Sequence, residues 1–316
     1  MNRLWRDVGL TRRIMVFVAS LFIVLVVALV YVIVAIPIRQ RVTNIDTGLS
    51  YSTIQEAVDA NETEDGNTLL VYAGLYRENV EVTKRVSIRG RDRGTAIVER
   101  GSRSVIAILV YASNSTIADL TVRDSHFGIW CLRTTGCKVS GNRVVNCTTG
   151  IRIDYSNNTL VTDNEVLDNV LRGIHIYGSS YNTVANNTIV NTGGDYAAID
   201  LEGYPGTGDV AIKNTLFHNR LINNSYGVWI NVGASETKLY HNSFLNNTHD
   251  LNHVATTGTV WDDDYPSGGN YWSLYTGLDL HSGPYQNITG NDGIGDTPYI
   301  PDTGSIDRYP FMQPPN

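Results

Sequence analysis

A histidine between segments that carry acidic side chains is the part of this sequence best suited to chemistry. His175 lies in the segment GIHIY, and similar five-residue segments stand before and after it. The preceding segment, GIRID, contains Arg152 and Asp154, and the following segment, AIDLE, contains Asp200 and Glu202. A neighbouring carboxylate fixes the tautomer of an imidazole and raises its pKa, which prepares it for proton transfer. These five residues are the candidate catalytic set.

Two kinds of polysaccharide chemistry would use these groups. In a lyase or an epimerase, His175 would act as the base, and Arg152 would stabilise a sugar carboxylate or a developing anion. In a glycoside hydrolase, two of Asp154, Asp200 and Glu202 would form the pair of carboxyl groups, which such enzymes hold about 5 to 9.5 Å apart. The alternative interpretation is a set of surface ion pairs, each worth under about 1 kcal/mol.

Aromatic and amide side chains at equivalent positions of these segments suit carbohydrate binding. Trp130 lies in GIWCL, Tyr177 in GIHIY, and Trp229 and Asn231 lie in GVWIN. Flat rings offer apolar faces for stacking against pyranose rings, and polar groups hydrogen-bond to sugar hydroxyls. The leading interpretation is therefore a glycan- or polysaccharide-binding face. Catalysis and a purely structural or interaction role are the alternatives.

The elements that must position these residues follow a repeat of about 22 residues. An apolar residue, two spacers and an asparagine recur, ending at Asn142, Asn164, Asn187, Asn219 and Asn242. The five-residue segments recur in phase with this column. Within each repeat, short apolar stretches alternate with period two between turn-forming Asn, Gly, Ser and Asp. Short strands at this period bury a continuous core only by stacking, which predicts an all-β, single-stranded parallel β-helix in which each repeat is one coil of about three strands.

The repeat predicts a role for the asparagines and a direction for each side chain. Equivalent residues of stacked coils lie about 4.8 Å apart, so asparagines in one column can form a hydrogen-bonded ladder. Asparagine also tolerates the left-handed backbone of a tight corner. In a G-I-x-I-x segment, period-two alternation turns the isoleucines inward and the x residues outward. The x column is Trp130, Arg152, His175, Asp200 and Trp229, which predicts an outward strip about 20 Å long.

The open N-terminal end of the β-helix must be covered. Residues 52–60, STIQEAVDA, predict a capping helix, with Ser52 and Gln55 at capping-box spacing and an apolar stripe of Ile54, Ala57 and Val58.

Two segments carry a resemblance to a known family. STIQEAVDA followed by GNTLLVYAGLYRENVEVTKRVSIRG resembles the opening of NosD-like right-handed parallel β-helix proteins, part of a broader group of carbohydrate-binding and sugar-hydrolase domains. GGNYWSLYTG, NDGIGDTPYI and IDRYPFM are similar to the tail of secreted, often archaeal, members. The resemblance covers about residues 50–312 and implies the fold. With three methionines and dispersed histidines, the chain does not resemble a copper relay, so that role is not carried over.

Two further groups could bind a metal. Asn291, Asp292 and Asp296 offer oxygen ligands around glycine-permitted turns, as Ca²⁺ prefers. The alternative is a turn-rich plug over the C-terminal coil. His218 and His241 occupy the same slot in adjacent coils and could hold a metal with a third ligand, although a solvated corner is the simpler interpretation.

An apolar run of 23 residues, from Ile14 to Ile36, predicts a transmembrane signal anchor. Four arginines precede the run and two follow it, which places the N-terminus in the cytoplasm and the remainder outside. The predicted organisation is a basic cytoplasmic tail (1–13), the anchor (14–36), a linker (37–50), the β-helix with its N-terminal cap (51–260) and a C-terminal capping segment (261–316).

Net charge and composition limit the kinds of partner that the exported part of the chain is expected to bind. Residues 1–41 carry a net charge of +5 and the whole chain −7, which leaves −12 beyond residue 41. An acidic surface does not favour nucleic acid. The expected partners are a glycan, the membrane through the N-terminal helix, and envelope proteins.

Eight N-x-S/T sequons permit glycosylation, at Asn61, Asn114, Asn146, Asn157, Asn186, Asn223, Asn246 and Asn287. Cys131, Cys137 and Cys147 predict buried thiols, with one disulfide as the alternative.

Overall fold

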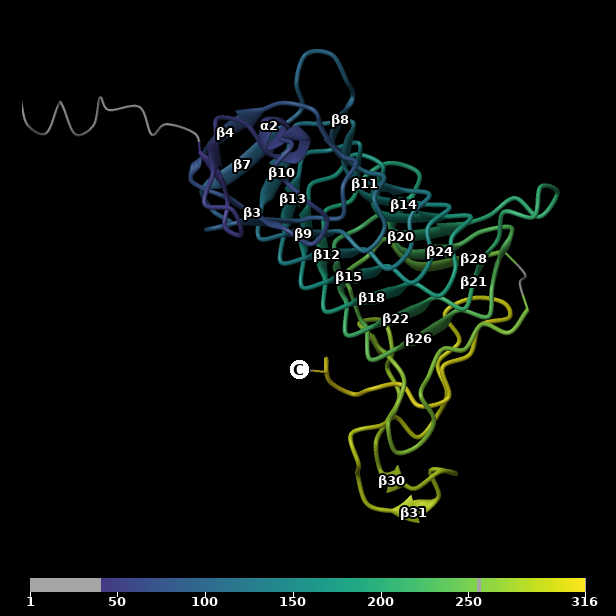
Figure 1. The fold of residues 1–316 in the computed structure, drawn as a ribbon. Helices are drawn as coiled ribbons and strands as arrows, with labels where there is room; N and C mark the ends of the chain where they lie inside the picture. Colours follow the sequence, from purple (N-terminus) through teal and green to yellow (C-terminus); the bar gives the residue numbers. More distant parts are fainter. Residues whose placement is uncertain (1–40, 255–256, 316) are drawn as a thin grey trace, which may run out of the picture. The chain divides into compact units, whose positions relative to one another are not determined.

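A computed structural model describes residues 41–254 and 257–315. Three sheets run along the molecule, and each coil of the chain adds one short strand to each sheet (Figure 1). Neighbouring strands of successive coils pair in parallel, for example β14 with β17 and β17 with β20. The predicted all-β parallel β-helix is confirmed.

The first sheet, as far as the structure describes it, contains β2 (Ser50–Tyr51), β1 (Val42–Asn44), β3 (Thr68–Val71), β6 (Ser87–Gly90), β9 (Thr116–Ala118), β12 (Lys138–Ser140), β15 (Leu160–Thr162), β18 (Thr183–Ala185), β22 (Thr215–Phe217) and β26 (Lys238–Tyr240), in this order. The second contains β4 (Gly74–Arg77), β7 (Ala96–Glu99), β10 (Thr121–Arg123), β13 (Arg143–Val145), β16 (Glu165–Leu167), β19 (Thr188–Val190), β23 (Arg220–Ile222), β27 (Ser243–Leu245) and β29 (Tyr271–Trp272).

The third sheet carries the candidate residues. It contains β5 (Val80–Val82), β8 (Ile106–Val110), β11 (Phe127–Leu132), β14 (Thr149–Asp154), β17 (Arg172–Tyr177), β20 (Ala197–Glu202), β24 (Tyr226–Ile230) and β28 (His249–His253). Two small pairs complete the described strands: β21 (Ala211–Ile212) with β25 (Ala234–Ser235), and β30 (His281–Ser282) with β31 (Ile288–Thr289).

The core is a column of apolar side chains that repeats from coil to coil. Ile151, Ile174 and Ile199 pair in register on β14, β17 and β20, and all three are fully buried. Glycine opens most of the segments on this sheet because the next coil passes very close. A Cβ on Gly173 would lie 2.5 Å from the carbonyl oxygen of Ala198.

The asparagine ladder is confirmed, but two adjacent residues share the roles that the sequence assigned to one. Asn164 and Asn187 are buried, and Asn164 Nδ2 donates to Asn187 Oδ1 at 2.9 Å. The left-handed backbone belongs to the residue before each ladder position, namely Asp163 (φ 58°) and Asn186 (φ 57°). Thus one residue turns the corner, and the next places its amide inside the ladder.

The N-terminal cap is a six-residue helix, α2 (Ile54–Asp59). Ile54, Ala57 and Val58 are buried, as the apolar stripe predicts. The predicted capping box is wrong by one residue. Thr53 is the N-cap and Glu56 its reciprocal partner, because the Thr53 side chain accepts a hydrogen bond from the Glu56 backbone N–H.

Strands that join the sheets also lie outside the stretch 51–260. β1 and β2 lie within or beside the stretch 37–50 that the sequence assigned to a linker, and β29 continues the second sheet past residue 260. The predicted anchor, 14–36, lies outside the described residues. Within the described residues, the structure has no helix long and apolar enough to cross a membrane.

The cysteines and sequons have simple structural settings. Cys131, Cys137 and Cys147 are free, buried thiols. All eight sequon asparagines lie at exposed positions.

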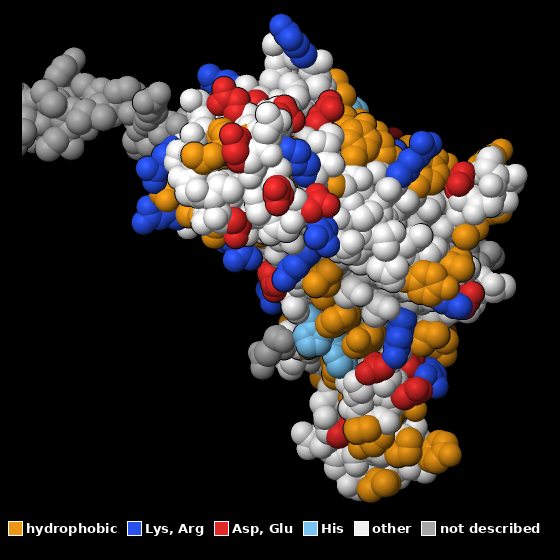
Figure 2. All heavy atoms as spheres, in the orientation of Figure 1, with side chains coloured by type: hydrophobic (Ala, Val, Ile, Leu, Met, Phe, Trp, Pro, Cys, Tyr) orange, Lys and Arg blue, Asp and Glu red, His pale blue; other side chains and the backbone are white. Residues whose placement is uncertain are grey.

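In the C-terminal segment around β30 and β31, hydrophobic side chains gather on the surface (Figure 2), and Leu278, Tyr285 and Ile288 are among the exposed ones.

Candidate functional site

The third sheet brings the predicted strip into one column. Trp130 pairs with Arg152, Arg152 with His175, His175 with Asp200, and Asp200 with Trp229. The column therefore crosses β11, β14, β17, β20 and β24 with aromatic rings at both ends and charged groups in the middle. A second column, two residues further along each strand, pairs Asp154 with Tyr177 and Tyr177 with Glu202.

The middle of this strip is buried, which corrects the expectation of an open outward surface. His175 is 3% exposed, Asp200 is 0% exposed and Asp154 is 2% exposed. Along each strand these three residues alternate with buried apolar residues, as the period-two pattern predicts. Solvent is excluded because Arg152 and Arg172, whose side chains are only 24% and 15% exposed, lie against these carboxylates.

Arg172 is the main site residue that the sequence did not reveal. Its Nε donates a hydrogen bond to Asp200 Oδ2 on the next coil, and its guanidinium lies 3.5 Å from the centroid of the Tyr196 ring. Arg152 makes the equivalent bond within its own strand, with Nε 2.7 Å from Asp154 Oδ2. The sequence does contain one clue to this contact. Arg172 stands immediately before the GIHIY segment, and the neighbouring strand β20 carries Asp200.

His175 lies at the centre of the buried polar groups. Its Nε2 is 3.4 Å from Glu202 Oε2, and neither ring nitrogen makes a hydrogen bond of standard geometry among the described residues. One ligand atom each from His175, Asp200 and Glu202 lie within 4.8 Å of one another. Burial raises the pKa of the carboxyl groups of Asp154 and Asp200. Contact with the His175 ring lowers the pKa of Glu202.

Partly exposed aromatic rings flank the charged centre. Around Trp130, the ring of Phe127 lies 5.0 Å away between centroids, and the Arg152 guanidinium lies 4.9 Å from the Trp130 centroid. At the other end, the ring of Trp229 lies 5.3 Å from that of Tyr226 and 5.9 Å from that of Tyr196.

The rings of Phe127, Tyr196 and Tyr226 were not predicted. They lie at or just before the starts of β11, β20 and β24, outside the G-I-x-I-x pattern that identified the two tryptophans.

Tyr177 and Asn231 lie to one side of the main column. The Tyr177 ring is half-buried and forms an edge-to-face contact with Tyr155, with centroids 5.5 Å apart. Asn231 follows β24, and its backbone N–H donates to the Leu201 carbonyl at 2.8 Å. Both residues belong to the same face of the third sheet, so the strip is wider than a single column.

The predicted calcium ligands are occupied by groups of the protein. Asp296 accepts hydrogen bonds from the backbone N–H groups of Leu280 and His281 and pairs with His281 Nδ1 at 2.9 Å. Asp292 accepts from Gln286 Nε2 and from the Ile294 backbone N–H. These contacts explain a stable turn without a metal.

Asn291, the third predicted ligand, is exposed in the same segment. Nothing in this geometry supports Ca²⁺, which stays a prediction from the sequence.

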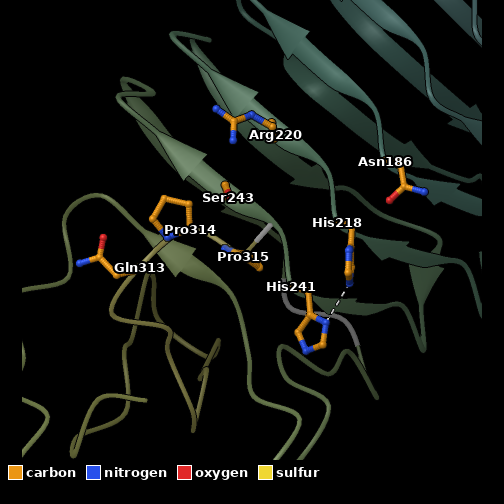
Figure 3. A pocket seen from close by; sticks show the side chains of 8 residues that line it. All are labelled: Asn186, His218, Arg220, His241, Ser243, Gln313, Pro314 and Pro315. Carbon is orange, nitrogen blue, oxygen red and sulfur yellow. Dashed lines mark hydrogen bonds between the residues drawn. The ribbon is translucent and has the colours of Figure 1, made fainter. Parts of the chain in front are cut away.

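His218 and His241, on adjacent coils, line a pocket of about 470 Å³ beside the C-terminal residues 313–315 (Figure 3). His218 Nε2 lies 3.0 Å from His241 Nδ1, and His241 Nε2 lies 2.8 Å from the Ser267 carbonyl oxygen. Asn186 and Arg220 also line the pocket, and none of the described residues that line it carries a carboxylate or a thiol. The pair is therefore satisfied by the protein itself, as a corner interaction between coils.

Comparisons with known proteins give relatives of two kinds. Over 163 residues, 49% of this chain, it is 29% identical to a cell surface glycoprotein of Methanothermus fervidus, of which the match covers 27%. Over 161 residues it is 30% identical to a probable ABC transporter binding protein NosD of Pseudomonas aeruginosa, of which the match covers 34%. The chain thus spans about a third or less of the length of these curated relatives.

Among solved structures, the chain is similar to an alginate lyase from Paenibacillus sp. str. FPU-7, with a TM-score of 0.43 and 15% identity, covering 70% of this chain and 74% of that one. It is also similar to the tailspike protein gp49 of Acinetobacter baumannii bacteriophage Fri1, a capsular polysaccharide depolymerase. That similarity has a TM-score of 0.47 and 13% identity, and covers 69% and 49% of the two chains.

A protein-family model described as "Periplasmic copper-binding protein (NosD)" matches residues 50–277. Cu⁺ prefers thiolate and thioether ligands. Among the described residues, the three thiols are buried and separate from the acidic cluster, and Met312 is the one methionine. These residues do not fit a Cu⁺ site.

The match to this family model covers more than two thirds of the 316 residues, and its repeat is the one that the three stacked sheets display. The chain belongs to the NosD family.

Proposed function

We propose that this protein binds carbohydrate outside the cytoplasm, along the face of the third sheet that carries Trp130 and Trp229. The observation that carries the proposal is the placement of these two half-buried rings in one register column, four strands apart, on either side of Arg152, His175 and Asp200. Four strand spacings correspond to roughly 19 Å, which accommodates a few sugar units.

The chemistry of this face suits a sugar chain. The rings of Trp130 and Trp229 offer apolar surface for stacking, and the neighbouring Arg152 and Glu202 are partly exposed donors and acceptors for hydroxyl groups. The guanidinium of Arg152 lies against the Trp130 ring, which holds both groups in place before a ligand binds. A preorganised face loses little conformational entropy on binding.

Glycan arrays followed by calorimetry test this function. Trp130→Ala and Trp229→Ala should each weaken binding of the glycan found on the array by about 3- to 10-fold, the loss of one aromatic contact. Tyr285→Ala is the matched control because that ring is 83% exposed in the C-terminal segment, away from the third sheet. Binding that is unchanged in both tryptophan variants would contradict the proposal.

The proposed location outside the cytoplasm is supported by the net charge and the sequons of the chain, and by one relative. Residues beyond 41 carry a net charge of −12, the eight sequon asparagines are exposed, and a relative is named a cell surface glycoprotein. We extend this proposal to a single-pass anchor at residues 14–36. Protease treatment of intact cells should remove the β-helix, and carbonate extraction should leave the chain in the membrane fraction. Release by carbonate would exclude the anchor.

Catalysis by the same face is the alternative function. Asp200 is fully buried and bonded to Arg172, so it offers a substrate no accessible oxygen. A lyase, epimerase or hydrolase would have to act through Glu202, whose side chain is 33% exposed, with the buried His175 behind it. Incubation with a polysaccharide panel distinguishes the two functions: product that is formed by the wild type and lost in Glu202→Gln would establish an enzyme. Absence of both product and array binding would leave a structural or envelope-interaction role.

A further inference from the structure

The buried polar cluster on β17 and β20 contains more unsatisfied atoms than a structural ion pair requires. His175 is 3% exposed, and both of its ring nitrogens lack a hydrogen bond of standard geometry among the described residues. Asp200 is 0% exposed, and its Oδ1 also lacks a partner. A buried polar atom without a partner costs about 1–3 kcal/mol, so unpartnered atoms on two directly paired residues need an explanation.

The backbone register brings one ring nitrogen of His175 close to the carboxylates of Asp200 and Glu202. His175 and Asp200 are directly paired across adjacent strands, and Glu202 follows two residues later on the same side of β20. One nitrogen and two carboxylate oxygens come within 4.8 Å of one another. Metal–ligand bonds of about 2.0–2.2 Å place neighbouring ligand atoms of a tetrahedral site roughly 3.3–3.6 Å apart, so these three atoms need to move together only modestly to hold one ion.

The surrounding groups orient the ligands as the second shell of a metal site does. Arg172 donates to Asp200 Oδ2, and the other carboxylate oxygen, Oδ1, has no partner among the described residues. Hydrogen bonds of this kind fix the position of a ligating carboxylate. Glu202, at 33% side-chain exposure, connects the buried atoms with solvent and gives an ion a route of entry.

The local charge balance leaves room for a cation. Asp154, Asp200 and Glu202 supply three negative charges, and Arg152 and Arg172 supply two positive charges. Leaving the imidazole out of the count, the cluster contains one more carboxylate than guanidinium group. Burial makes a charge unfavourable unless a partner neutralises it.

We propose that His175, Asp200 and Glu202 bind a divalent transition-metal cation, of which Zn²⁺ and Mn²⁺ are representative. One imidazole and two carboxylates suit such ions, whereas Cu⁺ requires softer donors. The family description names copper without naming its ligands, and these donors are harder than those that Cu⁺ prefers. His175 and Asp200 are buried beneath the partly exposed face, and Glu202 is the one ligand that also reaches that face.

Metal titration of the full chain tests the site. After chelator treatment and dialysis, calorimetry with Zn²⁺ and mass-spectrometric metal analysis should show about one equivalent bound per chain. His175→Gln and Glu202→Gln should each weaken Zn²⁺ binding by at least about tenfold. Affinity should also fall at acidic pH, because the ligands of a metal must be deprotonated to bind it.

Two controls keep the result interpretable. His218→Gln removes a histidine from the separate His218–His241 pair and should leave Zn²⁺ binding unchanged. Glu202 is the most exposed of the three ligands, so Glu202→Gln should retain the far-ultraviolet circular dichroism of the wild type.

Three outcomes would overturn the proposal. They are a wild type that takes up neither Zn²⁺ nor Mn²⁺, Zn²⁺ binding that is unaffected in both ligand variants, and Cu⁺ binding tighter than Zn²⁺ at the same residues. The first, together with an NMR titration showing a protonated His175 ring at neutral pH, would identify the cluster as an internal ion pair instead.

Discussion

Asn142 and Asn164 occupy the same position in consecutive coils, and Asn164 Oδ1 accepts both the backbone N–H and the side-chain Nδ2 of Asn142, at 2.9 and 3.1 Å. Asn164 in turn makes the same two bonds to Asn187. Each amide thereby satisfies a backbone donor of the coil before it, at a corner where no strand ladder is available. The repeat of 22–23 residues is fixed by this exchange as much as by the apolar core.

Removal of one ladder amide should destabilise the fold strongly. Asn164→Ala leaves the backbone N–H of Asn142 without its acceptor and removes the hydrogen bonds that Asn164 Nδ2 donates to the carbonyl groups of Val139 and Thr162. The expected loss is about 3 kcal/mol in the free energy of unfolding, measured by urea denaturation. The control is Asn223→Gly, at an exposed corner with φ 54°, which should change stability by less than about 1 kcal/mol. Equal effects of the two substitutions would contradict the ladder's role.

The ion pair between Arg172 and Asp200 should show strong coupling. Arg172→Leu leaves a fully buried carboxylate without its cation and should cost about 3–5 kcal/mol. Asp200→Asn in the same chain should recover much of this loss, because the unpaired charge is gone. Arg89→Leu, which breaks the exposed pair with Asp119, is the matched control and should cost under about 1 kcal/mol. Thermal and urea unfolding measure the free energy of unfolding of each variant in this double-mutant cycle. Purely additive losses would contradict the coupling.

Asp307 should make the C-terminal cap sensitive to pH. This fully buried carboxylate accepts hydrogen bonds from Trp272 Nε1 at 2.8 Å and from the Asn270 backbone N–H at 2.7 Å. Burial raises the pKa of Asp307 to about 7. The folded state therefore holds more protons than the unfolded state between about pH 4 and 7, so stability falls as the pH rises through this range.

The wild type should lose on the order of 2 kcal/mol between pH 5 and pH 8 through this residue. Asp307→Asn cannot titrate and should show a smaller difference between the two pH values, although it is less stable at both because one acceptor oxygen is lost. Asp195→Asn, at an exposed position, serves as the control. A wild type and an Asp307→Asn variant with the same pH dependence would exclude Asp307 as the titrating group.

Glycosylation should distinguish adjacent asparagines. Asn186 is exposed at a corner and begins a sequon, whereas Asn187 is buried in the ladder. In a host that glycosylates exported proteins, peptide mass spectrometry should find glycan on Asn186 and none on Asn187. Asn186→Gln should remove that glycan without unfolding the protein. An unmodified Asn186 in a chain that carries glycan at the other sequons would contradict its accessibility.

The sequence by itself determined the period of the coils, the ladder and the parity of the strip. These features depend on a repeat of about 22 residues and on strand alternation, both of which can be read along the chain without knowledge of distant contacts. The same reasoning correctly excluded His175 from the apolar column. It placed the N-cap one residue too early because Ser52 and Thr53 are both good capping residues, and only the backbone geometry selects Thr53.

Only the tertiary structure decided which polar groups of the strip are buried. Arg172 reaches Asp200 across 28 residues of sequence, and the Tyr196 ring packs against Arg172. Period-two alternation gives the side of the sheet on which a residue lies, but not what covers that side. Solvent exposure depends on the conformations of long side chains from neighbouring coils, and here those side chains enclose His175 and Asp200.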